Sequence, residues 1–253
     1  MLLSTRSSSA KLKSALNGNS NFGAIAIVSD LKVAIMQPYF IPYAGYFRLM
    51  AATDLFVIYD CVQFPRRGWV HRNYLLDNQG QSQWFTLPLE KMKRHARIGE
   101  MIFRQSAVVE MAAEMRRFPI FSSSQFTESA FASVFNLATQ VGPLQFIVRL
   151  LEVVCDNLKI PFNVVFSSSL NIDPLLRGQD RILAITHAVG AKIYVNSPGG
   201  RGLYQASDFV RQNLELKFLR TWQGPMSSVL NYIGNGSCHS LMNDIRLQCE
   251  LDN

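Results

Sequence analysis

The chain has 253 residues, of which 48% are hydrophobic and 17% are charged, and its formal net charge is +7. This length and composition are typical of one large globular domain and exclude a chain that is disordered overall. No apolar run reaches the roughly 18 residues of a membrane-spanning helix, so we expect no membrane span. The four cysteines form no CxxC pair and suggest no disulfide framework, so we expect reduced cysteines and a cytoplasmic location.

The chain begins with a Ser- and Asn-rich stretch that carries no ordered signal-peptide pattern. We therefore expect residues 1–31 to be a flexible N-terminal extension and residues 32–253 to be a single α/β domain. Lys32–Met36 and Leu55–Asp60 are short and apolar, as buried parallel strands are. The helical spacing of Tyr43–Thr53 between them predicts a β-α-β unit.

A hairpin and a helical block are expected next. Arg72–Leu76 and Trp84–Leu89 flank an Asn-Gln-Gly turn, which predicts that they pair. Apolar residues then recur at three- and four-residue steps through Ser106–Leu158, with a break at Phe118-Pro119, so we expect a helical insertion over residues 105–160. Further strands are expected at 162–168, 192–196 and, as the last strand, 214–219, with helices at 180–189 and 205–213 and a loop at 197–202. The alternation predicts an α/β fold with a Rossmann-like, mostly parallel sheet and an inserted helical subdomain.

The stretch "IMQPYFIPYAGYF" leaves the first strand at the carboxyl edge of the expected sheet, where ligands of α/β proteins bind. Glycine in a helix is unfavourable by roughly 1 kcal/mol, so the glycine of the first helical turn favours close approach of a ligand. The ligand-binding candidates are Gln37, Tyr43, Gly45 and Tyr46. The alternative is that the aromatic rings belong to the core and the prolines only shape the turn.

The stretch "DCVQFPRRGWVHRN" follows the second strand and is a second candidate site. Asp60 and His71 are the catalytic candidates, because a carboxylate or an imidazole accepts a proton in general base catalysis. Amides, guanidinium groups and an indole around them suit a charged, hydroxylated ligand. These binding candidates are Gln63, Arg67, Trp69, Arg72 and Asn73. The alternatives are that Trp69 packs in the core and that Arg66 is simply solvated.

A third candidate site joins a serine-ended strand, a helix start and the glycine-rich loop "NSPGGRGLY". Open backbone N–H groups of such a loop can cradle an anion. The candidates are Ser168, Arg181, Gly199 and Gly200. A glycine-rich loop also forms wherever a turn needs positive φ, so this signal alone is weak.

Positive charge is concentrated between residues 66 and 104, where eight Lys and Arg stand against three acids. Such a field suits an anionic partner, and a solvated basic face is the alternative. The four cysteines and four histidines show no metal-ligand spacing, so we expect no metal site.

The two motifs together resemble the WbqC-like family of bacterial proteins, which occurs among genes for O-antigen and other surface glycans. His71 stands where Asn is more usual in that family. The positions that carry the resemblance are Gln37, Pro38, Pro42, Gly45, Tyr46, Phe47, Asp54, Asp60, Val62, Gln63, Phe64, Arg67, Gly68, Trp69, Arg72 and Asn73. The segment also carries a fainter similarity to HIGH-type nucleotidyltransferases, with Tyr43-Ala44-Gly45-Tyr46 at the signature. Two tyrosines there replace the two histidines, so this similarity implies the fold and a nucleotide-like pocket rather than the chemistry.

The resemblance implies a transferase of surface-glycan biosynthesis, with aminoacyl or acyl transfer to an amino sugar carried on a nucleotide or lipid. One alternative is a non-catalytic module that binds a nucleotide-sugar or nucleotide. RNA binding through the basic region ranks last, because no RNA-binding motif is present. We expect a small anionic or sugar substrate. Neither a cofactor nor an oligomeric state is specified by the sequence.

Overall fold

A computed structural model of the protein describes residues 30–136, 140–233 and 238–252. A flexible extension is expected for residues 1–31, and residues 1–29 of it lie outside the described residues. None of the helices in the described ranges is long and apolar enough to cross a membrane.

The centre of the fold is a six-stranded sheet whose strand order is β5-β2-β1-β6-β7-β8. Its strands are β1 (Lys32–Met36), β2 (Leu55–Ile58), β5 (Val164–Phe166), β6 (Ile193–Asn196), β7 (Glu215–Leu219) and β8 (Leu251–Asp252). The first five strands pair in parallel, and β8 pairs antiparallel with β7. This confirms the predicted Rossmann-like, mostly parallel sheet. The expectation that 214–219 is the last strand is wrong, because β8 follows it in the sheet. With two residues, β8 is too short to show a hydrophobic pattern in the sequence.

Strand β1 lies inside the sheet, because it pairs with β2 on one side and with β6 on the other. Val33 and Ala34 are completely buried there. From β1 the chain adds β2 and β5 on one side of the sheet and then crosses to the other side of β1 to add β6 and β7. The strand order therefore reverses between β1 and β6. In open α/β sheets such a reversal point opens a crevice at the carboxyl ends of the strands, where ligands bind.

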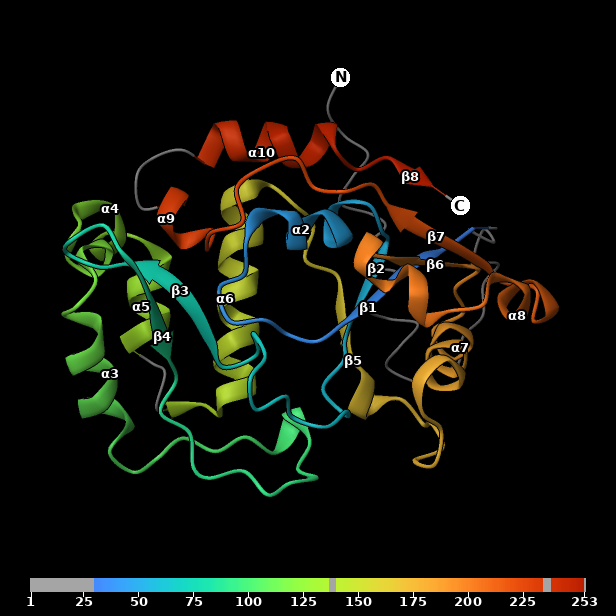
Figure 1. The fold of residues 1–253 in the computed structure, drawn as a ribbon, viewed down its shortest axis with the longest axis horizontal. Helices are drawn as coiled ribbons and strands as arrows, with labels where there is room; N and C mark the ends of the chain where they lie inside the picture. Colours follow the sequence, from blue (N-terminus) through green and yellow to red (C-terminus); the bar gives the residue numbers. More distant parts are fainter. Residues whose placement is uncertain (1–29, 137–139, 234–237, 253) are drawn as a thin grey trace, which may run out of the picture. The chain divides into compact units, whose positions relative to one another are not determined.

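Helices cover both faces of the sheet, and Figure 1 shows α2 and α6 on one side of it and α7 on the other. The α-helices connected to the sheet are α2 (Ala44–Ala51), α6 (Pro143–Leu158), α7 (Gly178–Ala188), α8 (Ala206–Arg211), α9 (Leu230–Ile233) and α10 (Cys238–Leu247). Gly190, which follows α7, has φ +71, the left-handed conformation that commonly ends a helix. Residues 197–202, expected as a loop, form most of the 3₁₀ helix η5 (Pro198–Leu203).

A hairpin and a set of short helices separate β2 from β5. Strands β3 (Arg72–Leu76) and β4 (Ser82–Thr86) pair antiparallel, with Tyr74 opposite Trp84. The helical elements are η1 (Ile98–Glu100), α3 (Ala107–Met115), η2 (Pro119–Ser122), α4 (Ser124–Thr127) and α5 (Ala130–Asn136), and η4 (Ser167–Ser169) follows β5. The expected break in the helical block is η2. The second hairpin strand begins two residues before the predicted Trp84 and ends three before Leu89.

Candidate ligand-binding site

The three predicted segments meet at the carboxyl edge of the sheet. The backbone N–H of Phe40 donates to the carbonyl of Trp69 over 2.9 Å, which joins the first segment to the second. Arg181 on α7 donates from Nη1 to the Sγ of Cys61 over 3.1 Å, which joins the second segment to the third. Segments far apart in the sequence therefore form one rim.

Asp60, a catalytic candidate, lies immediately beyond β2 and is only 2% exposed. Its Oδ1 accepts hydrogen bonds from the Ser167 hydroxyl (2.8 Å) and the Ser168 backbone N–H (2.9 Å). Its Oδ2 accepts from the Ser168 hydroxyl over 2.6 Å. Both oxygens are therefore engaged by η4, and this geometry makes Asp60 a cross-link between the ends of β2 and β5.

Asn73 on β3 is 5% exposed and holds the turn that precedes α2. Its Nδ2 donates to the carbonyls of Phe40 (3.0 Å) and Ile41 (2.7 Å). Ile41 has φ +37, a strained value for a β-branched residue, and the Ser228 hydroxyl also donates to its carbonyl over 2.7 Å. The two donors over-determine this turn, so Asn73 stabilises the aromatic motif rather than facing a ligand.

Gly45 lies in the first turn of α2, and protein rings fill the space beside it. A Cβ built on Gly45 would lie 2.3 Å from Tyr43 Cε2 and 2.8 Å from Trp222 Cγ. Tyr46 is 3% exposed, and its hydroxyl donates to the Gln37 carbonyl over 2.9 Å. Burial raises the pKa of Tyr46 far above its usual value. The close approach that this glycine permits is therefore made by Tyr43 and Trp222.

The remaining candidates at the rim differ in how their polar atoms are used. The half-buried Gln37 side chain makes no hydrogen bond to any described residue. Arg181 is 5% exposed, and besides Cys61 it donates to the carbonyls of Leu176 (3.0 Å) and Asp173 (3.2 Å). Gly200 accommodates Asn196, whose Nδ2 would lie 2.2 Å from a Cβ at that position, whereas no atom lies within 4 Å of a Cβ at Gly199.

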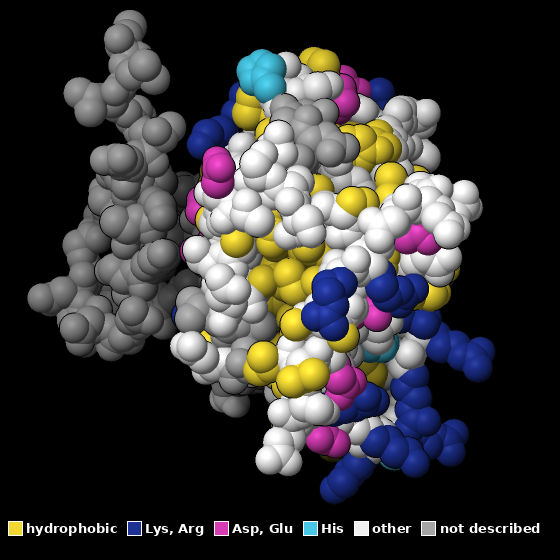
Figure 2. All heavy atoms as spheres, turned by 90° about the vertical axis from the view of Figure 1, so that its left-hand side faces the viewer, with side chains coloured by type: hydrophobic (Ala, Val, Ile, Leu, Met, Phe, Trp, Pro, Cys, Tyr) yellow, Lys and Arg dark blue, Asp and Glu magenta, His cyan; other side chains and the backbone are white. Residues whose placement is uncertain are grey.

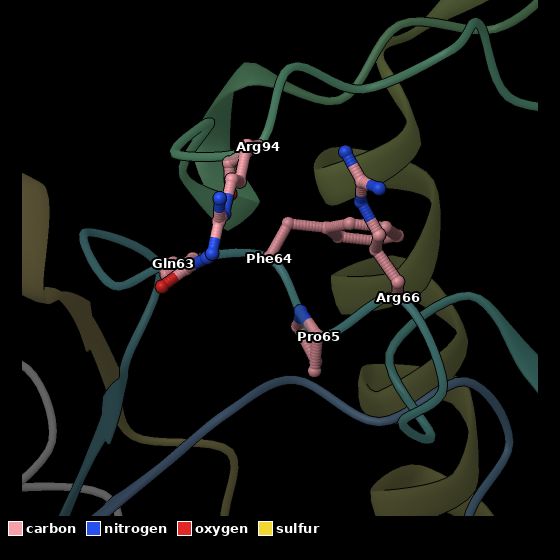
Figure 3. A pocket seen from close by; sticks show the side chains of 5 residues that line it. All are labelled: Gln63, Phe64, Pro65, Arg66 and Arg94. Carbon is pink, nitrogen blue, oxygen red and sulfur yellow. The ribbon is translucent and has the colours of Figure 1, made fainter.

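A cavity of about 620 Å³ opens beside the segment that follows β2. Its described lining residues include two arginines and no acid, and they are Gln63, Phe64, Pro65, Arg66 and Arg94. Figure 3 shows Gln63 and Arg94 on one side of the opening and Arg66 on the other, with Phe64 and Pro65 between them. The wall is fixed because Gln63 Nε2 donates to the Arg94 carbonyl over 2.6 Å and Phe64 N–H donates to the Ala96 carbonyl over 2.8 Å.

Positive charge surrounds this cavity. Arg66 is exposed and donates from Nη2 to the Met92 carbonyl over 3.3 Å. The Arg94 guanidinium makes no hydrogen bond or ion pair within the described part of the chain. Figure 2 shows Lys and Arg side chains gathered at one lower corner of the face that it draws, and Figure 1 shows the chain between β4 and α3 running along the bottom of the molecule. Both arginines therefore keep N–H donors for an anion.

His71, the other catalytic candidate, packs behind a wall of this cavity. Its ring lies 4.9 Å from the Phe64 ring, measured between centroids. Burial, with a smaller contribution from the neighbouring Arg72 charge, lowers the pKa of His71 to about 4. The imidazole is therefore neutral at pH 7, and its buried Nδ1 has no hydrogen-bond partner among the described residues.

Arg67, Trp69 and Arg72 lie on the other side of the tight turn that ends at Gly68, whose N–H donates to the Pro65 carbonyl over 3.1 Å. The Arg67 guanidinium is exposed and contacts no described partner. Trp69 is 42% exposed, so it does not pack in the core. Arg72 lies over the ring of Trp84, 4.0 Å from its centroid.

Among the predicted ligand contacts, Tyr46 and Asn73 use their polar atoms on backbone carbonyls. The sequence did not indicate that Arg66 and Arg94 lie at one cavity. Their shared cavity depends on residues 94–98 returning to the segment after β2, where Gln63 and Arg97 form an isolated bridge. The excess of basic residues was the signal for it. No group of three or more His, Cys, Asp and Glu in the described ranges is arranged to hold a metal ion.

The segments that form this rim fall within the part of the chain that matches a known protein family. The model of the WbqC-like protein family matches residues 37–226. A curated relative, the "Uncharacterized protein Rv1507c" of Mycobacterium tuberculosis (strain ATCC 25618 / H37Rv), is 29% identical over 194 residues, which are 76% of this chain and 81% of the relative. No solved structure matches the chain.

Proposed function

The chain belongs to the WbqC-like protein family, and from this premise we propose that it is a cytoplasmic transferase of bacterial surface-glycan assembly. Its substrate is an amino sugar carried on a nucleotide or lipid phosphate. The observation that carries the proposal is the cavity lined by Arg66 and Arg94 without an acid. Two guanidinium forks facing one opening suit the oxygens of a phosphate or diphosphate.

The composition of the cavity matches such a ligand in two further respects. Phe64 and Pro65 supply apolar surface for a sugar or base ring, and the side-chain oxygen of Gln63 accepts a hydrogen bond from a hydroxyl or amine. A volume of about 620 Å³ is within the usual range for small-molecule sites.

The transfer step that we propose is acylation of the sugar amine. The amine nitrogen attacks the carbonyl carbon of an activated acyl or aminoacyl donor, a C–N bond forms, and the bond from that carbon to the leaving group breaks. The proton lost by the amine goes to the imidazole of His71 by way of solvent in the cavity, because His71 lies behind Phe64 and does not itself line the opening. An anion bound between Arg66 and Arg94 raises the pKa of this imidazole from its low value, which makes it a better base when substrate is present.

A non-catalytic nucleotide-sugar module is the second candidate, and the geometry of Asp60 favours it. A carboxylate that accepts three hydrogen bonds and is only 2% exposed is shielded from a substrate in the cavity. This second candidate predicts binding in the same cavity without turnover.

Mass spectrometry distinguishes the two. The protein is incubated with UDP-glucosamine and other nucleotide-activated amino sugars together with acetyl-coenzyme A or aminoacyl adenylates. Acylated sugar that disappears in His71→Gln supports the transferase. A raised Tm with unchanged masses supports the binding module. If no sugar nucleotide is acylated and none raises the Tm of the protein, the proposal is wrong. Binding of RNA oligonucleotides with a steep salt dependence would then assign the basic cavity to nucleic acid.

A further inference from the structure

Three aromatic rings form a surface cluster on the outer side of the β3–β4 hairpin. Tyr74 and Trp84 stack with their centroids 3.8 Å apart and a 29° angle between their planes. Trp69 lies 5.5 Å from Trp84 and 6.0 Å from Tyr74. We call these three residues the aromatic platform. We infer that the platform, with Arg67 and Arg72 beside it, binds the pyranose rings of an acidic glycan.

The platform is outside the hydrophobic core of the described residues. Trp222 belongs to that core, and half-buried tyrosines such as Tyr39 and Tyr43 pack against it, but the three platform residues do neither. Trp69 is 42% exposed, and Tyr74 and Trp84 are half-buried against each other. A large exposed ring beside them, outside the core, indicates contact with a partner. A cross-strand pair explains Tyr74 and Trp84 as hairpin stabilisers, but Trp69 lies outside both strands.

The polar atoms of the platform are free to bind a hydroxylated ligand. The indole N–H groups of Trp69 and Trp84 and the hydroxyl of Tyr74 make no hydrogen bond to any residue that the structure describes. The exposed ring of Trp69 for the C–H surface of a sugar, with unpaired donors around it for the sugar hydroxyls, is the chemistry that recognises a pyranose.

Charge identifies which pyranose fits. Arg67 is exposed, two residues before Trp69, and its guanidinium has no described partner. The Arg72 guanidinium covers Trp84 and donates from Nη2 to the Arg67 carbonyl over 2.9 Å. Arg67 therefore presents an unused planar fork beside an exposed ring, which suits the carboxylate of a uronic acid.

The ring geometry favours a glycan over single-stranded RNA. Proteins bind single-stranded nucleic acid by stacking successive bases on several open aromatic rings. Tyr74 and Arg72 occupy Trp84 at 3.8 and 4.0 Å, and Trp69 is tilted by 44° from Trp84 and 67° from Tyr74. With Trp84 covered in this way, the platform does not offer a row of open rings for successive bases, whereas a single pyranose needs only the exposed ring of Trp69.

This inference rests on the proposed function for the assignment to glycans, but it concerns a surface separate from the cavity. None of the three platform residues is among the described residues that line the cavity. The cavity holds the activated, phosphate-bearing sugar, and the platform holds the acidic glycan. The platform thus binds an acceptor or product rather than the donor phosphate.

The test is a fluorescence and calorimetric titration of the full chain with galacturonate, mannuronate and glucuronate oligosaccharides, against maltohexaose and cellohexaose as uncharged probes. We expect at least one acidic oligosaccharide to bind and to outcompete the uncharged ones. Trp69→Ala and Arg67→Ala should each weaken it by about tenfold or more. Leu76→Ala, at an exposed position of the same hairpin face, should leave it unchanged.

The paired outcomes separate this inference from the proposed function. Arg66→Ala/Arg94→Ala, which empties the cavity of its guanidinium groups, should retain oligosaccharide binding, whereas Trp69→Ala should retain UDP-glucosamine binding. The inference is overturned if no acidic oligosaccharide binds, if Trp69→Ala binds as tightly as the parent protein, or if a single-stranded RNA 12-mer binds the platform more tightly than the glycans. Any of these results leaves the cavity measurements intact.

Discussion

Asp60→Asn tests whether this carboxylate is a cross-link or a catalyst. The substitution keeps the shape of the side chain and removes its charge. The two hydrogen bonds at the remaining oxygen then lose their charge assistance, and the bond from the Ser168 hydroxyl loses its acceptor because the amide nitrogen only donates. Bonds to charged groups contribute about 1.5–3 kcal/mol and neutral ones about 0.5–1.5 kcal/mol, so each bond weakens by about 1 kcal/mol. We expect the free energy of unfolding to fall by about 2–3 kcal/mol.

Urea unfolding followed by circular dichroism and tryptophan fluorescence measures this change. Ser168→Ala and the double variant Asp60→Asn/Ser168→Ala complete a cycle, and we expect a coupling free energy of about 1 kcal/mol between the two residues. Ser207→Ala, at an exposed position on α8, is the control and should have no effect. If Asp60→Asn unfolds within about 0.5 kcal/mol of the parent protein while turnover is lost, Asp60 is a catalytic residue and our assignment is wrong.

Three further outcomes follow from the same geometry. The pKa of His71 is lowered to about 4, below its unfolded value, so stability is lost as the pH falls from about 6.5 through 4. The free energy of unfolding in urea is measured at pH 7 and at pH 4.5. Between these pH values the parent protein should lose about 1–2 kcal/mol more stability than His71→Gln, a modest difference because the ring is only partly buried. Gly45→Ala should lower Tm in a thermal scan despite the better helix propensity of Ala, because its Cβ would lie 2.3 Å from Tyr43 and 2.8 Å from Trp222; an unchanged or higher Tm contradicts this packing. Asn73→Ala should lower the free energy of unfolding by about 2–3 kcal/mol, since the Phe40 carbonyl loses its side-chain donor and the Ile41 carbonyl keeps only Ser228. A loss below about 1 kcal/mol contradicts the role of Asn73 in the turn.

Local patterns were sufficient to predict the sheet and most helices. Short apolar strands such as Lys32–Met36 can be recognised because both of their faces are buried. The two-residue strand β8 has no such pattern, and it pairs only because the chain returns to the edge of β7. The 3₁₀ helix η5 likewise depends on Gly200 packing against Asn196, a contact that no local propensity reveals.

The candidate site was predictable in position but not in detail. Polar residues after parallel strands had to gather at one edge, and Asp60 does meet Ser167 and Ser168 there. Residue type alone cannot show whether an Asp or Asn faces a ligand or satisfies the backbone, because that depends on which donors the fold brings within 3 Å. The cavity arginines were obscured for the same reason, since Arg94 reaches Gln63 only through the return of a long connection.

The most direct test of the central claim is calorimetric titration of UDP-glucosamine into the full chain and its arginine variants. The account predicts that the parent protein binds and that Arg66→Ala/Arg94→Ala weakens binding by at least about 100-fold, since two charge-assisted contacts of about 1.5–3 kcal/mol each are lost. Arg246→Ala, which removes an exposed arginine of α10, should bind as the parent does. Binding by the double variant at parental affinity, or equal weakening in Arg246→Ala, would contradict a phosphate site between Arg66 and Arg94.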